Sequence, residues 1–505
     1  MTKNINYFLS RDLLWSIFDL ISIDANDQMH DRLRAVLCST HVCRGWRELL
    51  LQSSSIWGRL VLFKFEGVLH HKALLLAVIQ RSGSSPLWIE VYGRPAANDP
   101  QDLLRLLLPT LWCKVERIKL QAECLTQKAL EEYYLPLLNY PAPLLQQAHL
   151  IFYGRPAWAP PFDTQPAALF LNTAPCLLDF SAECIPISIH ATWLSGLTSL
   201  ETGPLSSFTK NVRETLEVLG RMTQLRTLIF DHDISENIRS MEEISALPAV
   251  HLKHLTYMAI RGYSLNGLAL VDRVKRSPSG CLVNFGLYTL SSTPSPVAVV
   301  TTLFNNVFAD NVHYLCGSQP VDWISICYNG MDLIIADRKC SQNSIVNYIP
   351  EITRTGIYLK FILNTPDINS LMASVMGTIS NAPTLQGITT LRLVVAEHHH
   401  RILDPQFLLK FPSVETLEAH YKTLLLLEAW SSSDHAFVPF PELTKLRFLS
   451  FEDAIHHAKP LISFLRHRLA LKKQIKTLEV VNTNNRIQLE KKLLEIPAVT
   501  AVVFR

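Results

Sequence analysis

Apolar residues in the first part of the chain recur at helical spacing. One helical face is formed by Leu9, Leu13, Leu14, Ile17, Phe18 and Ile21. The polar stretch 22–31 can end this helix, and apolar positions at 33–37 and 42–50 predict two more short helices before the serines at 53–55. Three short helices in about 50 residues bury little apolar surface on their own, so we expect this segment to gain from a partner.

The rest of the chain repeats an order of helix, turn and strand. The order is clearest at 70–92, where an apolar helix precedes an Arg-Ser turn and an alternating strand, and it returns at 267–288 and 461–481. Short strand-like runs, many with Leu-x-x-Leu or Leu-x-Leu spacing, occur at 115–121, 147–153, 225–230, 252–260, 322–328, 388–395, 414–420, 443–449 and 475–481. This alternation predicts a fold built from repeated strand-containing units.

We therefore predict the α/β fold class, with a three-helix module at 1–65 and a curved, leucine-rich-repeat-like solenoid with a largely parallel sheet at 66–505. At 20–29 residues per repeat, the second region would hold about 15 units. The repeats are degenerate, because their spacing is irregular and the asparagine or cysteine ladder of the consensus is not clean. A Rossmann-like domain would also alternate strands and helices, but its usual glycine fingerprint does not occur.

The first region resembles an F-box over about residues 8–60. The segment FLSRDLLWSIFDLI supplies the Leu-x-x-x-Leu-Leu-x-x-Ile-Phe opening of that family, and Val-Cys-Arg-x-Trp-Arg and a serine run ending in Trp57 follow in order. The family usually opens with Leu-Pro, whereas this chain has Leu9-Ser10 and so lacks the proline that pre-sets the first turn. The combination of such a module with degenerate repeats also resembles the large F-box families of filamentous and mushroom-forming fungi.

The resemblance implies a module that docks on a Skp-type adaptor and thereby joins a cullin–RING ubiquitin ligase, with the solenoid recruiting a target protein. The residues that would meet the adaptor from the first helix are Leu9, Ser10, Leu13, Ile17 and Phe18. Val42, Cys43 and Trp46 of the third helix would meet the adaptor or support that surface. Trp46 should then be exposed or half-exposed, whereas Trp57 should be buried toward the solenoid. The alternative is a non-ligase scaffold in which these helices cap the repeat array.

A repeated pentapeptide supports internal duplication of the sequence. Tyr-Gly-Arg-Pro-Ala occurs at 92–96 and again at 153–157, which places Arg94 and Arg155 at equivalent positions after strands. The proline that follows each arginine should prevent the strand from continuing. Both arginines either lie in solvated turns or contact an anionic group of the bound target.

Composition narrows the class of protein. Hydrophobic residues make up 48% of the chain and charged residues 18%, with a net charge of +3, so neither disorder nor a basic nucleic-acid-binding field is expected. No run of 18 apolar residues predicts a membrane span, and the N-terminus lacks the apolar core of a signal peptide. Because the ten cysteines form no C-x-x-C pair, we expect free thiols and a cytoplasmic or nuclear location.

Motifs that would indicate an enzyme are missing. The chain has no phosphate-binding loop, no G-x-S-x-G elbow and no H-E-x-x-H motif. The histidines at 398–400 are either a solvated polar stretch or a weak metal site, and the Asp-His-Asp run at 231–233 is either a turn or an acid/base centre. We expect no catalytic residue, no metal and no cofactor, although an unrecognised enzyme site stays an alternative.

Overall fold

The arrangement of the chain is taken from a computed structural model. It describes residues 9–23, 28–64, 68–93, 103–123, 130–153, 168–185, 187–203, 211–231, 238, 240–262, 265–276, 282–288, 298–299, 301–303, 305–307, 323–328, 332–337, 358–364, 377, 386–395, 405–433, 439–449, 454–481, 493 and 499–504. Contacts divide the chain into two units, Met1–Lys210 with Glu217–Asp233 and Asn211–Leu216 with Ile234–Arg505. The contact division therefore falls near residue 233, and a boundary at 65 stays a prediction.

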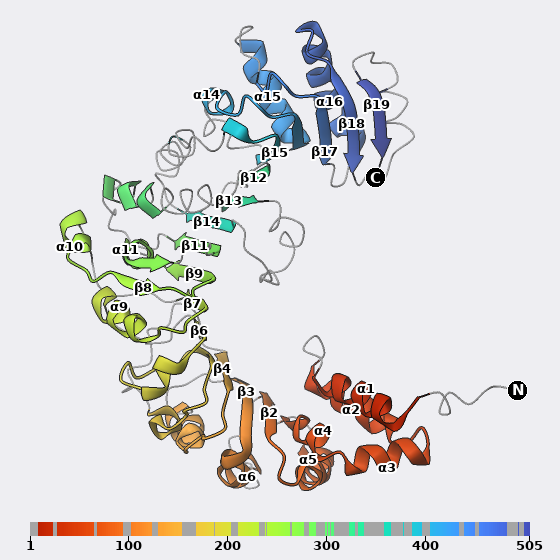
Figure 1. The fold of residues 1–505 in the computed structure, drawn as a ribbon, viewed down its shortest axis with the longest axis vertical. Coiled ribbons are helices and arrows are strands. Elements are labelled where there is room, and N and C mark those ends of the chain that lie inside the picture. Colours follow the sequence, from red (N-terminus) through yellow and green to blue (C-terminus); the bar gives the residue numbers. More distant parts are fainter. Residues whose placement is uncertain are drawn as a thin grey trace, which may run out of the picture. The chain divides into compact units, whose positions relative to one another are not determined.

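The first unit begins with four short helices (Figure 1): α1 (Arg11–Ile23), α2 (Met29–Ser39), α3 (Arg44–Gln52) and α4 (Ser54–Gly58). The hydroxyl of Ser10 accepts a hydrogen bond from the Leu13 amide at 3.3 Å and so caps the start of α1. This cap replaces the pre-set turn that a proline would give. At α3 the Cys43 thiol accepts from the Trp46 amide at 3.5 Å, so the helix begins at Arg44 and Val42 precedes it.

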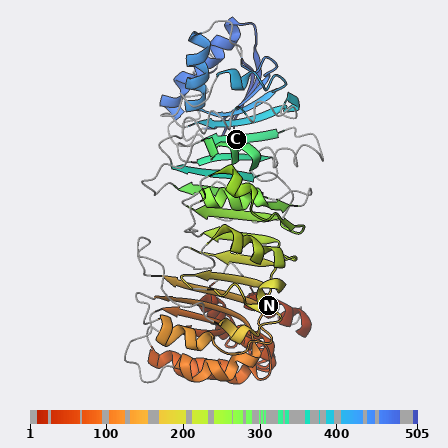
Figure 2. The same ribbon diagram turned by 90° about the vertical axis from the view of Figure 1, so that its left-hand side faces the viewer.

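A parallel sheet follows, and its strands pair in the order of the chain (Figures 1 and 2). Its strands are β1 (Val61–Lys64), β2 (Leu87–Gly93), β3 (Val115–Glu123), β4 (Gln147–Tyr153), β5 (Asp179–Glu183), β6 (Ser199–Thr202) and β7 (Thr227–Asp231). The connections contain α5 (Val68–Ser82), α6 (Leu103–Leu111), η2 (Trp112–Lys114), η3 (Leu130–Tyr134), α8 (Leu135–Leu138), η4 (Leu169–Asn172), η5 (Thr192–Gly196) and α9 (Val212–Arg221). Because these neighbouring strands are parallel, every strand starts at the same end of the sheet, as in a repeat fold.

The register aligns one apolar position of every strand. Adjacent in the sheet and all buried are Val61, Ile89, Ile118, Ala148, Phe180, Leu200 and Leu228. The next residue of each inner strand points to the opposite face, where Glu90, Lys119, His149, Ser181 and Glu201 form the adjacent row. One face of the sheet is therefore the core, and the other is polar.

The Leu-x-x-Leu pattern in the sequence marks the turn into each strand. Leu197 and Leu200 are both buried, and the Leu197 amide donates to the Leu194 carbonyl at 3.2 Å; Leu225 and Leu228 repeat this arrangement. Aligned positions are separated by 20 residues (Phe180 to Leu200) up to 32 residues (Ala148 to Phe180), so the predicted repeat length of 20–29 residues was too narrow. The short repeat uses a 3₁₀ turn, η5, where longer ones hold other helices.

The second unit contains α10 (Met241–Ser245), β8 (Val250–Leu252), β9 (Tyr257–Gly262), α11 (Leu265–Arg273), β10 (Val274–Arg276), β11 (Leu282–Tyr288), β12 (Trp323–Tyr328), β13 (Asp332–Asp337), β14 (Tyr358–Asn364), β15 (Thr390–Val395), α14 (Pro405–Leu408), β16 (Thr416–His420), α15 (Tyr421–Ser433), β17 (Lys445–Leu449), α16 (Ala454–Ala470), β18 (Ile475–Val481) and β19 (Val499–Phe504). Strands β15 to β19 pair in parallel and in chain order, whereas β13 lies antiparallel between β12 and β14. The short strands β8 and β10 form a separate two-stranded parallel sheet.

The polar face of β16 to β18 pairs its own charges. Arg447 contacts Glu418 at 2.9 Å and Glu479 at 3.7 Å, and Lys445 contacts Glu479 at 2.9 Å. The two carboxylates are nearly buried, yet each lies beside a cation on a neighbouring strand. On this face the charges of neighbouring repeats therefore neutralise one another.

These observations confirm the predicted α/β class with a largely parallel sheet. The strands β4 and β18 have the same limits as the predicted runs 147–153 and 475–481, and the predicted segment at 70–92 forms α5 and β2. The antiparallel β13 was not anticipated. None of the described helices combines the length and apolarity needed to cross a bilayer.

Candidate protein-interaction site

An exposed apolar row lies along α1. Leu13, Ile17 and Leu20 share one helical face and are 54%, 41% and 68% exposed, and Val42, just before α3, is 58% exposed. We call these four residues the N-terminal apolar row. Isolated apolar residues at a surface are common, but three along one face of a short helix form a continuous apolar surface, which makes this face a candidate for contact with another protein.

The helices beneath this row are held by aromatic packing. Phe18 is 1% exposed and meets Trp46 edge to face, with 5.1 Å between the ring centres. Trp46 is half-buried, and its indole nitrogen has no hydrogen-bond partner among the described residues. The pair joins α1 to α3 and fixes the direction in which the apolar row points.

The structure separates the sequence-predicted residues into two groups. Ser10, Leu13, Ile17 and Val42 are exposed, so their side chains are accessible to a partner. Leu9, Cys43 and Trp46 are half-buried, and Phe18 lies in the interior. Phe18 therefore supports the surface from below and, in this conformation, does not reach an adaptor directly.

Trp57 is fully buried, as the sequence predicted, whereas Trp46 is only half-buried. The Trp57 indole donates to the Leu50 carbonyl at 2.8 Å, and the Arg81 guanidinium of α5 lies 4.8 Å from the centre of its ring. Beside it, Gly58 packs so closely on the turn before β2 that an added Cβ would lie 2.5 Å from the Pro86 carbonyl oxygen. Helix α4 is thus fixed to the first repeat.

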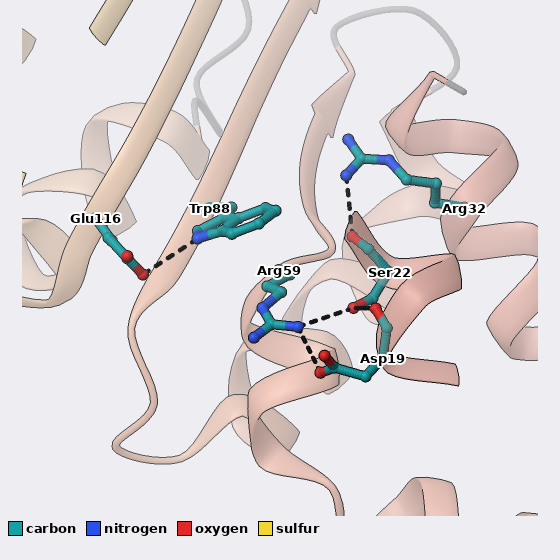
Figure 3. Close-up of polar contacts among 6 residues, drawn as sticks. All are labelled: Asp19, Ser22, Arg32, Arg59, Trp88 and Glu116. Carbon is teal, nitrogen blue, oxygen red and sulfur yellow. Dashed lines mark hydrogen bonds and ion pairs between the residues drawn. The ribbon is translucent and has the colours of Figure 1, made fainter. Parts of the chain in front are cut away.

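A nearly buried ion pair joins α2 to the polar face of the sheet. The Arg32 guanidinium contacts the Glu90 carboxylate of β2 at 2.8 Å. It also donates to the Ser22 carbonyl at 3.0 Å, a bond that Figure 3 shows. Tyr92 donates to the same carboxylate at 2.6 Å, and burial together with this hydrogen bond raises the pKa of Tyr92. Arg32 therefore fixes the end of α1 and the start of the sheet to one another.

A second contact lies next to it. Arg59 pairs with Asp19 of α1 at 2.5 Å, and its guanidinium carbon is 5.2 Å from the centre of the Trp88 ring (Figure 3). Arg117 of β3 lies over the same ring at 3.8 Å, and the indole donates to Glu116 at 3.2 Å. Trp88 is thus stacked with two cations, and the helices and the first strands form one continuous contact network.

The remaining candidates from the sequence fall largely outside the described residues. Arg94, Arg155, the histidines at 398–400 and residues 232–233 are among these, so the possible anion contact and the possible acid/base centre stay predictions. Strand β2 ends at Gly93, directly before the first of the two arginines. In the described parts of the chain, no group of three His, Cys, Asp or Glu side chains could hold a metal ion.

Sequence reasoning missed Leu20 and the Arg32–Glu90 pair. Leu20 follows Ile17 by three residues, so its place on the exposed face could have been read from helical spacing. The ion pair joins residues 58 positions apart, and no local pattern indicates which acid an arginine will meet at that separation.

Comparisons with known proteins leave the family open. No protein-family model matches the chain, and no curated protein matches it. Among solved structures, a leucine-rich repeat-containing protein from Legionella pneumophila is similar over 63% of this chain and 90% of that one, with 12% sequence identity and a TM-score of 0.26. The repeat architecture of the present chain rests on its own strand register.

Proposed function

We propose that this chain is the substrate-recognition subunit of a Skp–cullin–F-box ubiquitin ligase. The observation that carries the proposal is the N-terminal apolar row, exposed on a three-helix module whose sequence resembles an F-box. In this function the row meets a Skp-type adaptor, and the repeat region recruits a target protein. The chain contributes no catalytic group, because holding target and ligase together raises their effective concentration.

The contact network at Arg32, Arg59 and Trp88 supports this function. A recruiting subunit needs its two docking surfaces at a fixed separation, since a flexible connection lowers the effective concentration of the target near the ligase. Here the Arg32–Glu90 ion pair binds α2 to β2. Asp19 of α1 pairs with Arg59, whose guanidinium lies over Trp88 of β2. The adaptor surface and the first repeats therefore move as one body.

The direct test is capture of a purified Skp-type adaptor by the full-length chain. We expect Leu13→Asp and Ile17→Asp each to weaken capture by about ten- to a hundred-fold, because burying one such side chain contributes about 1.5–3 kcal/mol. Leu106→Asp is the matched control, since Leu106 is a helical leucine 65% exposed elsewhere in the same unit. Failure of the wild-type chain to bind any Skp-type adaptor would exclude the proposal.

A second candidate is a protein-binding scaffold outside any ligase, with the helices acting as a cap. The Arg32–Glu90 pair favours it, because a cap must be fixed to the first repeat. Under this function, replacing apolar-row residues would change no adaptor contact, whereas removing the helices would destabilise β1 and β2. Adaptor capture therefore distinguishes the two candidates.

A further inference from the structure

The polar face of the first unit is accessible beyond β2. Arg32 and Arg59 bring the helical module onto β2, whereas β3 to β7 carry partly exposed polar side chains on the same face. Lys119, His149, Ser181 and Glu201 are neighbours in register and form a row across the strands. Ser181 is buried in this row and donates to the Glu201 carboxylate at 3.0 Å, whereas the other three side chains are partly exposed. Such a face is a platform on which another chain can lie.

Cations occupy the β3 end of this platform. Arg117 and Lys119 are two residues apart and point to the same side. Among the described residues, neither lies within 4.0 Å of a carboxylate; Arg117 stacks on Trp88, and the Lys119 amine is 5.6 Å from the centre of the Tyr92 ring. Partial burial lowers the pKa of Arg117, and the charges of Glu116 and Asp179 oppose this lowering.

Carboxylates occupy the other end. Glu183 ends β5, Glu201 lies on β6 and Asp231 ends β7. Burial, and then the charges of Asp231 and Glu201, raise the pKa of Glu183, which shows that the three groups share one negative field. A cation placed there would relieve this repulsion.

Between the two ends lies a mixed pair. His149 of β4 and Asp179 of β5 approach to 3.7 Å. The face therefore changes from positive on β3 to negative on β5 to β7. This separation is not a general result of the repeat, because the face of β16 to β18 alternates the signs and pairs them directly.

From this separation we infer that the polar face of β3 to β7 binds an extended segment of the target protein that carries an acidic group and a basic group about three to five residues apart. The segment crosses the strands, with its acidic group over Arg117 and Lys119 and its basic group over Glu183 and Glu201. From β3 to β5 or β6 is two or three strand spacings, about 10–14 Å at ~4.8 Å each. An extended chain covers that distance in about three to four residues.

The inference deepens the proposed function, since it names the chemistry of the target on which that function depends. Its test uses the full-length chain and the synthetic peptide Ser-Asp-Glu-Gly-Ser-Gly-Lys-Lys-Ser, with binding measured by isothermal titration calorimetry. Comparison peptides carry only the acidic pair, only the basic pair, or both pairs separated by a spacer of about twelve residues. We expect each comparison peptide to bind at least ten-fold more weakly than the first.

Charge reversal on the chain makes the test specific. Lys119→Glu and Glu201→Lys should each weaken binding of the mixed peptide at least ten-fold. The double variant leaves Arg117 beside a new carboxylate and Glu183 beside a new amine, so neither end carries one sign of charge and the mixed peptide should bind it as weakly as it binds the single variants. Lys253→Glu is the control with the same charge change, on an exposed lysine of the second unit, and should leave binding unchanged.

Three results would overturn the inference: equal binding of the all-acidic or all-basic peptide, no effect of the single reversals, or a double variant that binds the mixed peptide as tightly as the wild type does. Circular dichroism of each variant confirms that the sheet is intact. Adaptor capture is measured on the same samples. Loss of adaptor capture with peptide binding preserved would reject the ligase function and leave the charge-matched platform standing.

Discussion

Arg468 is a buried cation whose acceptors are backbone carbonyls. It is almost fully enclosed in α16 and donates to the carbonyls of Pro439, Phe440, Leu443 and Lys473 at 3.0–3.3 Å. Burial lowers the pKa of its guanidinium to about 10. The side chain thereby supplies donors to carbonyls of the turns that lead into β17 and β18, and among these four only the Phe440 carbonyl has a second donor in the described residues, the Leu443 amide at 3.1 Å.

We expect Arg468→Met to lower the free energy of unfolding by about 3 kcal/mol or more, since each orphaned buried carbonyl costs about 1–3 kcal/mol. Urea unfolding followed by circular dichroism measures the change. Arg466→Met, on the same helix but exposed, should stay within about 0.5 kcal/mol of the wild type. Equal effects of the two substitutions would mean that the carbonyl contacts contribute little.

Glu183 gives a pH-dependent prediction. Because folding raises its pKa above 4.5, the folded chain binds this proton more readily than the unfolded chain. Its contribution to stability therefore falls as pH rises from about 4.5 through the raised value. Glu183→Gln removes the charge, so we expect a higher midpoint of thermal unfolding than wild type at pH 7 and a smaller difference at pH 4.

Thermal scans of both chains across pH 4–8 test this expectation. Glu217→Gln is the control, because Glu217 is exposed on α9. A difference between wild type and Glu183→Gln that stays constant with pH would show that the charge of Glu183 is not the cause.

At the scale of elements, the Arg32–Glu90 ion pair holds α2 against β2. The Arg32 and Glu90 side chains are only 7% and 12% exposed, so removing one leaves the other as a nearly buried charge. We expect Arg32→Met or Glu90→Gln to cost about 3 kcal/mol, and the double variant to cost clearly less than the sum of the two. Urea unfolding gives the free energies.

The Arg44–Glu48 pair of α3 is the internal comparison, because its side chains are 91% and 55% exposed. Its coupling energy should be far smaller than that of the Arg32–Glu90 pair, because solvent screens exposed charges. Hydrogen exchange should also increase in α1 and α2 of the Arg32 variant. Similar coupling energies for the two pairs would show that burial does not strengthen the Arg32–Glu90 contact.

Local patterns predicted the elements that depend on local packing. Alternation in QAHLIFY and IKTLEVV gave β4 and β18, since one side of each strand faces the core. Helical spacing likewise placed Leu13 and Ile17 on one face of α1. It did not separate Phe18 from them, because Phe18 is adjacent to Ile17 and only its contact with Trp46 of α3 determines that it is buried.

Features that depend on distant partners were beyond the sequence. The antiparallel β13 pairs with β12 on one side and β14 on the other, and the apolar pattern of a strand does not indicate the direction of its neighbours. The charge separation on the first polar face required the register of β3 to β6, because Lys119 and Glu201 are far apart in the chain and neighbours only by way of His149 and Ser181.

For the whole molecule, the net charge of +3 does not reveal that the two units arrange their charged side chains differently. The second unit distributes its charges in nearly buried pairs on β16 to β18, where they neutralise one another. The first unit keeps cations and carboxylates apart on one face. Because each unit is built from nearest-neighbour contacts between repeats, these faces can differ without any change in the core register.

The separated face gives the first unit an electric dipole that runs across its strands. A dipole acts beyond contact distance and turns an approaching molecule of mixed charge before the two surfaces touch. Orientation during approach increases the rate of association more than the lifetime of the complex. Dissolved salt shortens the range of this field to about 10 Å at 0.1 M, so encounters should slow with ionic strength while complexes already formed dissociate at nearly the same rate.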